Sequence, residues 1–195
     1  IGMGNMGTSH AKNILSGKVR GMRITAVADI VKEKLSWSEE NLPFAKRYTS
    51  ATELFESGEV DAVIICTPHY AHPELVIEAL KNGIHVVSEK PAGVYTKQVR
   101  EMNDFARNQN KTFAMMFNQR TNCVYRKIKE IVDSKAYGEI RRINWIITDW
   151  YRTQAYYNSG GWRATWVGEG GGVLLNQSPY QLDLWQWICG MPEKI

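Results

Sequence analysis

Lys90 is the residue whose setting points most directly to chemistry. It lies between Glu89 and Pro91, directly after the apolar run from Ile84 to Ser88, which is typical of a buried parallel strand. An ammonium group at the end of such a strand can stabilise negative charge that develops on a bound substrate. We therefore expect Lys90 to act in catalysis. The Lys90-Pro91 bond is also a candidate cis peptide, because X-Pro bonds tolerate that isomer.

A glycine pattern at the start of the chain predicts a nucleotide site. Residues 2–7 read Gly-Met-Gly-Asn-Met-Gly, or G-x-G-x-x-G. The first glycine allows a tight turn, the second lets the backbone approach a pyrophosphate, and the third lets a helix pack closely on the strand. Because the chain begins inside this pattern, we expect its first strand to be incomplete.

An acidic residue indicates which dinucleotide is preferred. Asp29 ends a strand-like run 22 residues after Gly7. Its carboxylate can accept hydrogen bonds from ribose hydroxyls and repels a 2′-phosphate, which favours NAD over NADP. The cofactor contacts predicted from the pattern and this acid are Gly2, Gly4, Asn5, Met6, Gly7 and Asp29.

The elements that position these residues alternate as in a doubly wound α/β sheet. Expected strands cover 23–29, 47–48, 61–66, 84–88 and 112–116, and expected helices cover 8–15, 31–41, 51–57, 73–81 and 96–108. Ligands bind beyond the carboxyl ends of such strands. Asp29, Thr67-Pro68 and Glu89-Lys90 follow strands in this way, so one crevice can collect them. We predict a Rossmann domain over 1–117 and a second domain over 118–195.

A further set of polar residues lies near the C-terminus. Asn176, Tyr180 and Asp183 are spaced i, i+4, i+7, so a single helix with Pro179 in its first turn would place them on one face. A tyrosine with a pKa near 10 is a poor base at pH 7, but a cation within about 4 to 6 Å lowers that pKa by about one to three units. We predict that Tyr180, assisted by Lys90, takes a substrate hydroxyl proton while the neighbouring C–H gives hydride to nicotinamide. The alternative is a packed aromatic whose hydroxyl faces water.

Three motifs in this order resemble the glucose-fructose oxidoreductase and inositol dehydrogenase (Gfo/Idh/MocA) family. They are the glycine pattern, residues 67–72 (Thr-Pro-His-Tyr-Ala-His) and Glu89-Lys90-Pro91, and the resemblance continues through residues 118–120, 137–140, 161–163 and 170–175. It implies a nicotinamide-dependent oxidoreductase acting on a sugar, a polyol or a related compound, often as a homodimer or homotetramer. It also implies an α+β second domain with an open, mostly antiparallel sheet. Residues 140–148 would begin that sheet, and such proteins usually continue beyond residue 195.

The resemblance also implies individual site residues. Toward the cofactor it places Thr67, Pro68, His72, Glu89, Lys90 and Pro91. Toward the substrate it places Arg120, Trp162, Arg163, Asn176, Tyr180 and Asp183. The family usually carries aspartate where this chain has Asn176 and histidine where it has Tyr180. In having a tyrosine at position 180, this chain is similar to glucose-fructose oxidoreductase and the dimeric dihydrodiol dehydrogenases. For Arg120 a salt-bridged surface arginine is the alternative.

Composition narrows the classes of function. The net charge of +4 is spread along the chain, so no nucleic-acid surface is predicted. No apolar run reaches the roughly 18 residues of a membrane span. The three widely spaced cysteines indicate reduced thiols in a cytoplasmic protein, and the four histidines have no metal-binding spacing, so no metal is predicted. Two other functions stay open: a nucleotide-sensing regulator that has lost catalysis, and a glycosidase that uses tightly held NAD for transient oxidation.

Overall fold

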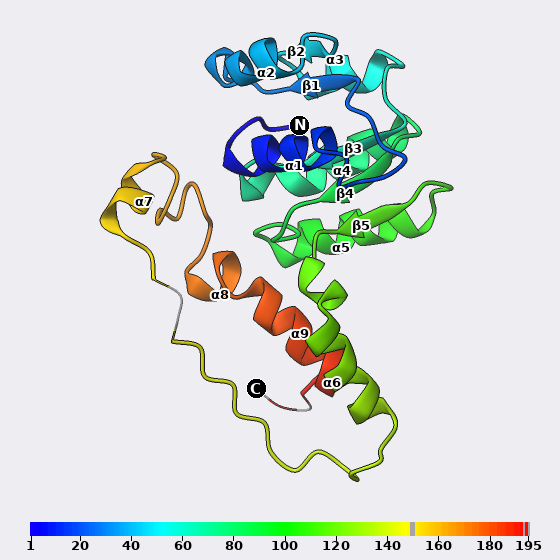
Figure 1. Cartoon of the computed structure of the whole chain (residues 1–195), viewed down its shortest axis with the longest axis vertical. Helices are drawn as coiled ribbons and strands as arrows, with labels where there is room; N and C mark the ends of the chain where they lie inside the picture. The colour runs from blue at the N-terminus through cyan, green and yellow to red at the C-terminus, as the bar shows by residue number, and fades with distance from the viewer. Residues whose placement is uncertain (149–150, 193, 195) are drawn as a thin grey trace. The chain divides into compact units, whose positions relative to one another are not determined.

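The computed structural model describes residues 1–148, 151–192 and 194. Clustering of contacts divides the chain into two compact units, Ile1–Met116 and Phe117–Ile195. In Figure 1 the first unit runs from blue to green and holds all the labelled strands, whereas the second runs from green to red and is drawn with helices and connecting segments.

The first unit is built on parallel strands. β1 (Ala26–Ala28) pairs with β2 (Lys46–Tyr48), and β4 (His85–Ser88) pairs with both β3 (Ala62–Ile65) and β5 (Phe113–Met115). All three pairings are parallel, with Val87 opposite both Ile64 and Ala114. The apolar runs that predicted strands covered on both faces are thus confirmed as parallel strands.

Residues Ile1 and Gly2 join the two groups of strands. The Gly2 amide donates to the Ala28 carbonyl at 2.8 Å, and the Cys66 amide donates to the Ile1 carbonyl at the same distance. These two residues therefore occupy the central strand position between β1 and β3. The resulting order, β2, β1, residues 1–2, β3, β4, β5, is that of a doubly wound nucleotide-binding sheet.

Helices cover this sheet, as the sequence predicts (Figure 1). They are α1 (Asn5–Leu15), η1 (Lys32–Leu35), α2 (Ser36–Asn41), α3 (Ala51–Glu56), η2 (His69–Ala71), α4 (His72–Lys81) and α5 (Thr96–Arg107). The helix predicted over 31–41 is a 3-10 turn followed by a short α-helix. α4 ends where Asn82-Gly83 predicts, because Gly83 adopts a φ of +71° that stops a helix.

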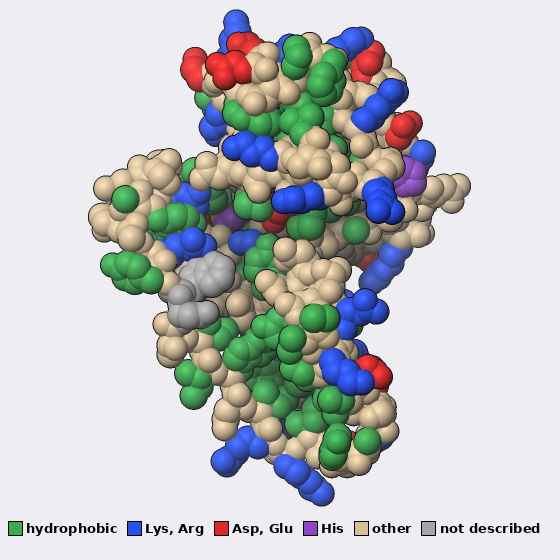
Figure 2. All heavy atoms as spheres, in the orientation of Figure 1, with side chains coloured by type: hydrophobic (Ala, Val, Ile, Leu, Met, Phe, Trp, Pro, Cys, Tyr) green, Lys and Arg blue, Asp and Glu red, His purple; other side chains and the backbone are tan. Residues whose placement is uncertain are grey.

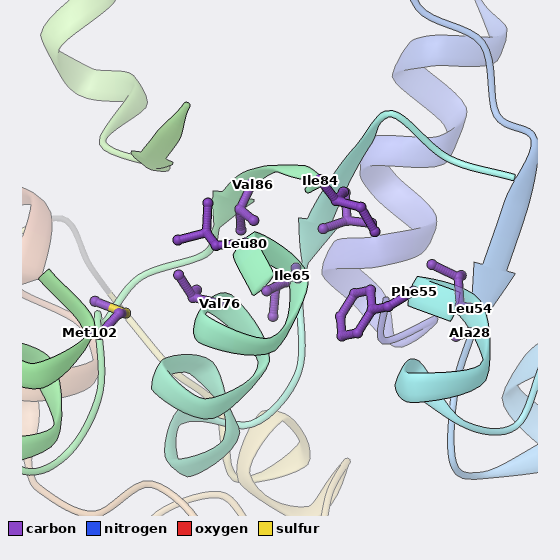
Figure 3. Close-up of a cluster of buried hydrophobic side chains, with 11 residues drawn as sticks. Ala28, Leu54, Phe55, Ile65, Val76, Leu80, Ile84, Val86 and Met102 are labelled. Carbon is purple, nitrogen blue, oxygen red and sulfur yellow. The ribbon is translucent and has the colours of Figure 1, made fainter. Parts of the chain in front are cut away.

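One hydrophobic cluster of the first unit lies between the sheet and helices α3, α4 and α5 (Figure 3). Burying one such aliphatic side chain stabilises the fold by about 1.5 to 3 kcal/mol. The cluster therefore fixes the strands whose carboxyl ends carry the candidate site. Its labelled members are Ala28, Leu54, Phe55, Ile65, Val76, Leu80, Ile84, Val86 and Met102.

The described residues of the second unit form short helices joined by irregular segments. Its elements are η3 (Asn118–Thr121), α6 (Cys123–Asp133), α7 (Gln154–Asn158), α8 (Val173–Asn176) and α9 (Pro179–Cys189). α6 contacts α9. Among the described residues of the second unit, the buried hydrophobic side chains are Leu184 and Ile188 of α9. Val124, Ile128 and Ile131 of α6 stay exposed. Figure 2 shows hydrophobic side chains at the surface of this unit.

Residues 140–148 differ from the expectation. They were expected to begin an antiparallel sheet, but the structure assigns no strand to them. A strand needs a partner for its backbone N–H and C=O groups, and the described residues of the second unit contain no other strand. The sheet implied by the resemblance is therefore not formed within the described chain.

Candidate functional site

The three glycines of the first turn have different surroundings. Gly2 has a φ of +84°, and a Cβ there would lie 2.7 Å from the Cys66 carbonyl oxygen. A Cβ on Gly7 would lie 1.9 Å from the Gly2 carbonyl oxygen, whereas a Cβ on Gly4 would meet no atom within 4 Å. The turn is thus closed at its first and third glycines and open at the second, as close approach of a pyrophosphate requires.

Helix α1 points its N-terminus into this turn. Gly4 is the N-cap, and no side chain accepts a hydrogen bond there. The amides of Asn5, Met6 and Gly7 lie in the first turn, where an α-helix has no internal acceptors for them. Such amides, together with the helix dipole, favour an anion, so this end of α1 fits a phosphate group.

Asp29 is held by the backbone of the same turn. Its side chain is buried; Oδ2 accepts a hydrogen bond from the Met3 amide at 2.7 Å, and Oδ1 accepts one from the Val31 amide at 2.9 Å. Each carboxylate oxygen retains a second lone pair for a ribose hydroxyl. The link from Asp29 to the glycine turn is a contact that the sequence pattern did not indicate.

Thr67 supplies an independent sign of a ligand. Its hydroxyl oxygen is buried in the turn after β3 and has no hydrogen-bond partner among the described residues. Buried hydroxyls are nearly always paired, so an orphaned one needs an explanation. A bound dinucleotide beyond the strand ends would supply the partner. The glycine turn, the α1 N-terminus and this hydroxyl together fit NAD.

Lys90 lies two residues after the end of β4, beyond the strand as predicted. The Glu89 amide donates to the Ile65 carbonyl at 2.8 Å, which extends the pairing of β3 and β4 to the residue before the lysine. The Glu89 side chain is buried, and its Oε1 lies 2.8 Å from Nε2 of His10 on α1. The Lys90-Pro91 peptide is cis, which confirms that expectation.

His72 is the first residue of α4 and is 1% exposed. Its Nδ1 lies 2.7 Å from the Pro91 carbonyl oxygen, and its Nε2 lies 2.8 Å from the Thr67 carbonyl oxygen. Both ring nitrogens therefore face the protein's own backbone. The resemblance implied that His72 lies on the cofactor side, and in the structure its ring contacts the turns after β3 and β4.

The titration of His72 predicts acid sensitivity of the fold. Burial lowers the pKa of His72, outweighing the bonds to Pro91 and Thr67 that raise it. In the unfolded chain a histidine titrates near 6.5. As pH falls below that value the unfolded state takes up the proton first, so stability that is present above pH 6.5 is lost on acidification.

We expect the urea midpoint of the whole protein to decrease as the pH is lowered from about 7 to about 5.5. In His72→Asn the urea midpoint should change less over the same pH range. Equal slopes in the two proteins would contradict the assignment to His72.

The helix predicted to carry three polar residues is interrupted. α8 ends at Asn176 and α9 begins at Pro179, so the prediction of one helix presenting Asn176, Tyr180 and Asp183 on one face is wrong. Proline has no N–H to donate to the preceding turn and its ring clashes with it, which breaks the helix. Tyr180 and Asp183 share α9, and Pro179 lies in its first turn as expected.

Asn176 contacts an acid that sequence reasoning missed. Its Nδ2 donates to Oε1 of Glu169 at 2.5 Å, and both side chains are buried. Glu169 directly precedes the run Gly170–Gly172. A carboxylate beside three consecutive glycines was the available signal, because such loops commonly carry functional groups.

Arg120 and Asp183 form a bidentate pair. Nε of Arg120 donates to Oδ2 of Asp183 at 2.8 Å, and Nη2 donates to Oδ1 at 2.6 Å. The guanidinium carbon also lies 5.6 Å from the centroid of the Trp187 ring. The structure thus has the salt-bridged arginine that was the alternative for Arg120, with the predicted substrate residue Asp183 as its partner.

Trp162 and Arg163 form a second aromatic and cationic group. Nη1 of Arg163 donates to the Tyr156 hydroxyl at 2.6 Å, and the guanidinium carbon lies 4.8 Å from the Trp162 ring centroid. The Tyr180 ring lies edge-on to Phe117, with centroids 6.5 Å apart. All these residues belong to the second unit.

None of the described helices is both long enough and apolar enough to cross a bilayer. Within residues 1–148, 151–192 and 194, no three histidine, cysteine or acidic side chains converge so that they could hold a metal ion.

Solved structures share this fold. The WlbA dehydrogenase of Chromobacterium violaceum, in complex with NADH and UDP-GlcNAcA, superposes with a TM-score of 0.84 at 28% identity, over 97% of this chain and 54% of that one. The corresponding enzyme from Bordetella pertussis gives a TM-score of 0.83 at 25% identity, over 97% of this chain and 58% of that one.

The chain is also similar in sequence to curated dehydrogenases. Myo-inositol 2-dehydrogenase of Thermotoga maritima is 27% identical over 97% of this chain and 54% of the relative. The scyllo-inositol 2-dehydrogenase (NAD(+)) of Bacillus subtilis is 25% identical over 97% of this chain and 53% of the relative. The chain thus spans about half the length of the curated relatives it matches.

Family models match both parts of the sequence. The model of the oxidoreductase family with an NAD-binding Rossmann fold matches residues 1–117, and that of the GFO/IDH/MocA C-terminal domain matches residues 125–195. The chain therefore belongs to the Gfo/Idh/MocA family of oxidoreductases.

Proposed function

We propose that the whole protein moves hydride between NAD and the hydroxyl-bearing carbon of a sugar, a polyol or a related compound. The observation that carries the proposal is the meeting of an open glycine turn, the orphaned Thr67 hydroxyl and Lys90 at the carboxyl ends of one parallel sheet. The inositol dehydrogenases among the relatives and the NADH-bound structural neighbours support the choice of reaction.

The chain's own residues have separate roles in this proposal. The amides at the start of α1 bind the pyrophosphate, and Asp29 accepts hydrogen bonds from the ribose hydroxyls. NAD, when bound, supplies the hydride acceptor. Tyr180 takes the proton of the substrate hydroxyl, and the Lys90 ammonium stabilises both the tyrosinate and the alkoxide that develops on the substrate.

The other predicted site residues of the second unit have positioning roles in this proposal. We place Trp162, Arg163 and Asn176 on the substrate side, where the asparagine amide can orient a hydroxyl but cannot accept its proton. The Arg120–Asp183 pair joins η3 to α9, the helix that carries Tyr180, and so fixes the orientation of that helix. The pair acts on the reaction through α9.

A screen of cofactors and substrates tests the reaction. The whole protein is incubated with NAD or NADP and a panel of inositols, aldoses and nucleotide-linked sugar acids, and NADH formation is followed by absorbance. We expect reduction of NAD with at least one member of the panel. NADH binding without any turnover would favour the regulator, and release of sugar without accumulation of NADH would favour the glycosidase.

Tyr180→Phe tests the proton acceptor. A positioned general base contributes about 10²- to 10⁴-fold, so we expect the single-turnover rate of hydride transfer to fall by about 100-fold or more. Tyr137→Phe is the matched control, because Tyr137 is a tyrosine of the same unit that is 87% exposed. A Tyr180→Phe protein that reacts as fast as this control would show that Tyr180 is only a packed aromatic.

We also propose a cytoplasmic protein that forms a homodimer or homotetramer. The three cysteines form no disulfide, and burial raises the pKa of the Cys66 thiol to about 11, so this thiol stays protonated at pH 7. The exposed apolar residues of α6 offer surface for subunit or domain contacts. Sedimentation of the whole protein would establish the number of subunits.

A further inference from the structure

Both neighbours of Lys90 in the chain are held by histidines from other elements. Before it, the Glu89 carboxylate contacts Nε2 of His10 at 2.8 Å, and His10 belongs to α1. After it, the Pro91 carbonyl contacts Nδ1 of His72 at 2.7 Å, and His72 begins α4. The backbone on either side of the lysine is therefore fixed by a separate helix.

The His72 contact also reaches the neighbouring strand end. Its Nε2 lies 2.8 Å from the Thr67 carbonyl, so one rigid ring spans the turn after β3 and the turn after β4. A neutral imidazole donates one of these two bonds and an imidazolium donates both. His72 is 1% exposed, so water does not reach its ring.

The Glu89 carboxylate is fixed at both of its oxygens. Oε1 contacts His10, and Oε2 accepts a hydrogen bond from the Lys90 amide at 3.2 Å. Glu89 is 5% exposed, and a buried carboxylate is stable only when its oxygens are bonded. Because His10 lies one turn after Gly7 in α1, this contact ties the lysine turn to the helix that begins at the glycine turn.

We propose that His10 and His72 are positioning residues for Lys90, acting through Glu89 and Pro91 and not through the reactants. The inference rests on the proposed function, because it assumes that the position of the Lys90 ammonium limits hydride transfer. Small misplacements of a reacting group cost large factors in rate: about 1 Å can cost about 100-fold. Removing either histidine frees one side of the turn.

Double-mutant cycles with Lys90→Met in the whole protein test this role. We expect His72→Phe to slow single-turnover hydride transfer by about 10- to 100-fold in the native background. In the Lys90→Met background the same change should cost less than about threefold, because the group being positioned is already gone. Equal losses in both backgrounds would overturn the proposal.

Three further variants separate positioning from folding. His10→Leu should show the same coupling to Lys90→Met at a partly exposed helix position, so it carries the test if His72→Phe does not fold. His72→Asn keeps a donor near the Nδ1 position, so its rate of hydride transfer should be close to the native rate and well above that of His72→Phe. His85→Gln removes a histidine from the far end of β4 and should leave hydride transfer unchanged. Fluorescence titration should give NADH dissociation constants within about threefold of the native value for all three.

A spectroscopic readout does not depend on turnover. Lysines of the whole protein are reductively methylated with ¹³C-formaldehyde, and the Lys90 resonance is assigned by its loss in Lys90→Arg. We expect His10→Leu and His72→Phe each to move this resonance toward that of exposed lysines. An unmoved resonance would overturn the positioning role even in an active enzyme. If the resonance moves but the native protein oxidises no compound of the panel, the positioning role is supported and the proposed function is rejected.

Discussion

Replacing Lys90 with methionine should slow hydride transfer by about three orders of magnitude. Methionine keeps much of the length of the side chain but removes the ammonium. Loss of one preorganised electrostatic contact to a developing oxyanion costs about 10²- to 10³-fold. In the proposed mechanism the Lys90 ammonium also lowers the pKa of Tyr180 from its ordinary value near 10, so we expect a further loss when that ammonium is removed. The rate of NADH formation in a single turnover measures the combined effect.

Lys97→Met is the matched control for this experiment. Lys97 lies in α5 of the same unit, its side chain is 88% exposed, and its Nζ is 4.0 Å from a carboxylate oxygen of Glu101. Exposed pairs of this kind contribute little to stability. We expect the control to keep the native rate and both variants to bind NADH. A Lys90→Met protein as fast as the control would remove Lys90 from the mechanism.

The strand ends were predictable from sequence because their causes are local. Mostly apolar runs predicted β3 and β4, and strands of a parallel sheet bring their carboxyl ends to one edge. Asn82-Gly83 predicted the end of α4 because glycine readily adopts positive φ. These signals located Thr67 and Lys90 correctly at neighbouring strand ends.

The contacts that fix those residues were not predictable, because they join distant parts of the chain. His10 and Glu89 are 79 residues apart, and Arg120 and Asp183 are 63 apart. Periodicity carries no information about such pairs. A spacing of i, i+4, i+7 assumes an unbroken helix, so the rule failed where Pro179 interrupts it.

Replacing Gly7 with alanine should both destabilise the first unit and abolish tight binding of NAD. The added Cβ would lie 1.9 Å from the Gly2 carbonyl oxygen, and a backbone oxygen cannot rotate away as a side chain can. Relief requires α1 to move from the glycine turn. Overpacking usually costs about 1 to 3 kcal/mol, and with backbone as the obstacle we expect a loss near or above the upper value. Urea unfolding of the whole protein measures it.

Gly4→Ala separates an effect on stability from an effect on cofactor binding. Its Cβ would meet no protein atom within 4 Å, so we expect a urea midpoint close to the native one. The same methyl group would stand where the pyrophosphate is expected to approach the backbone, so NADH affinity should fall by about 100-fold, or about 2.7 kcal/mol. A Gly4→Ala protein with native affinity would show that the dinucleotide does not approach this glycine. A Gly7→Ala protein of native stability would show that α1 can shift without cost, and the helix N-terminus would then be too loosely held to orient a phosphate.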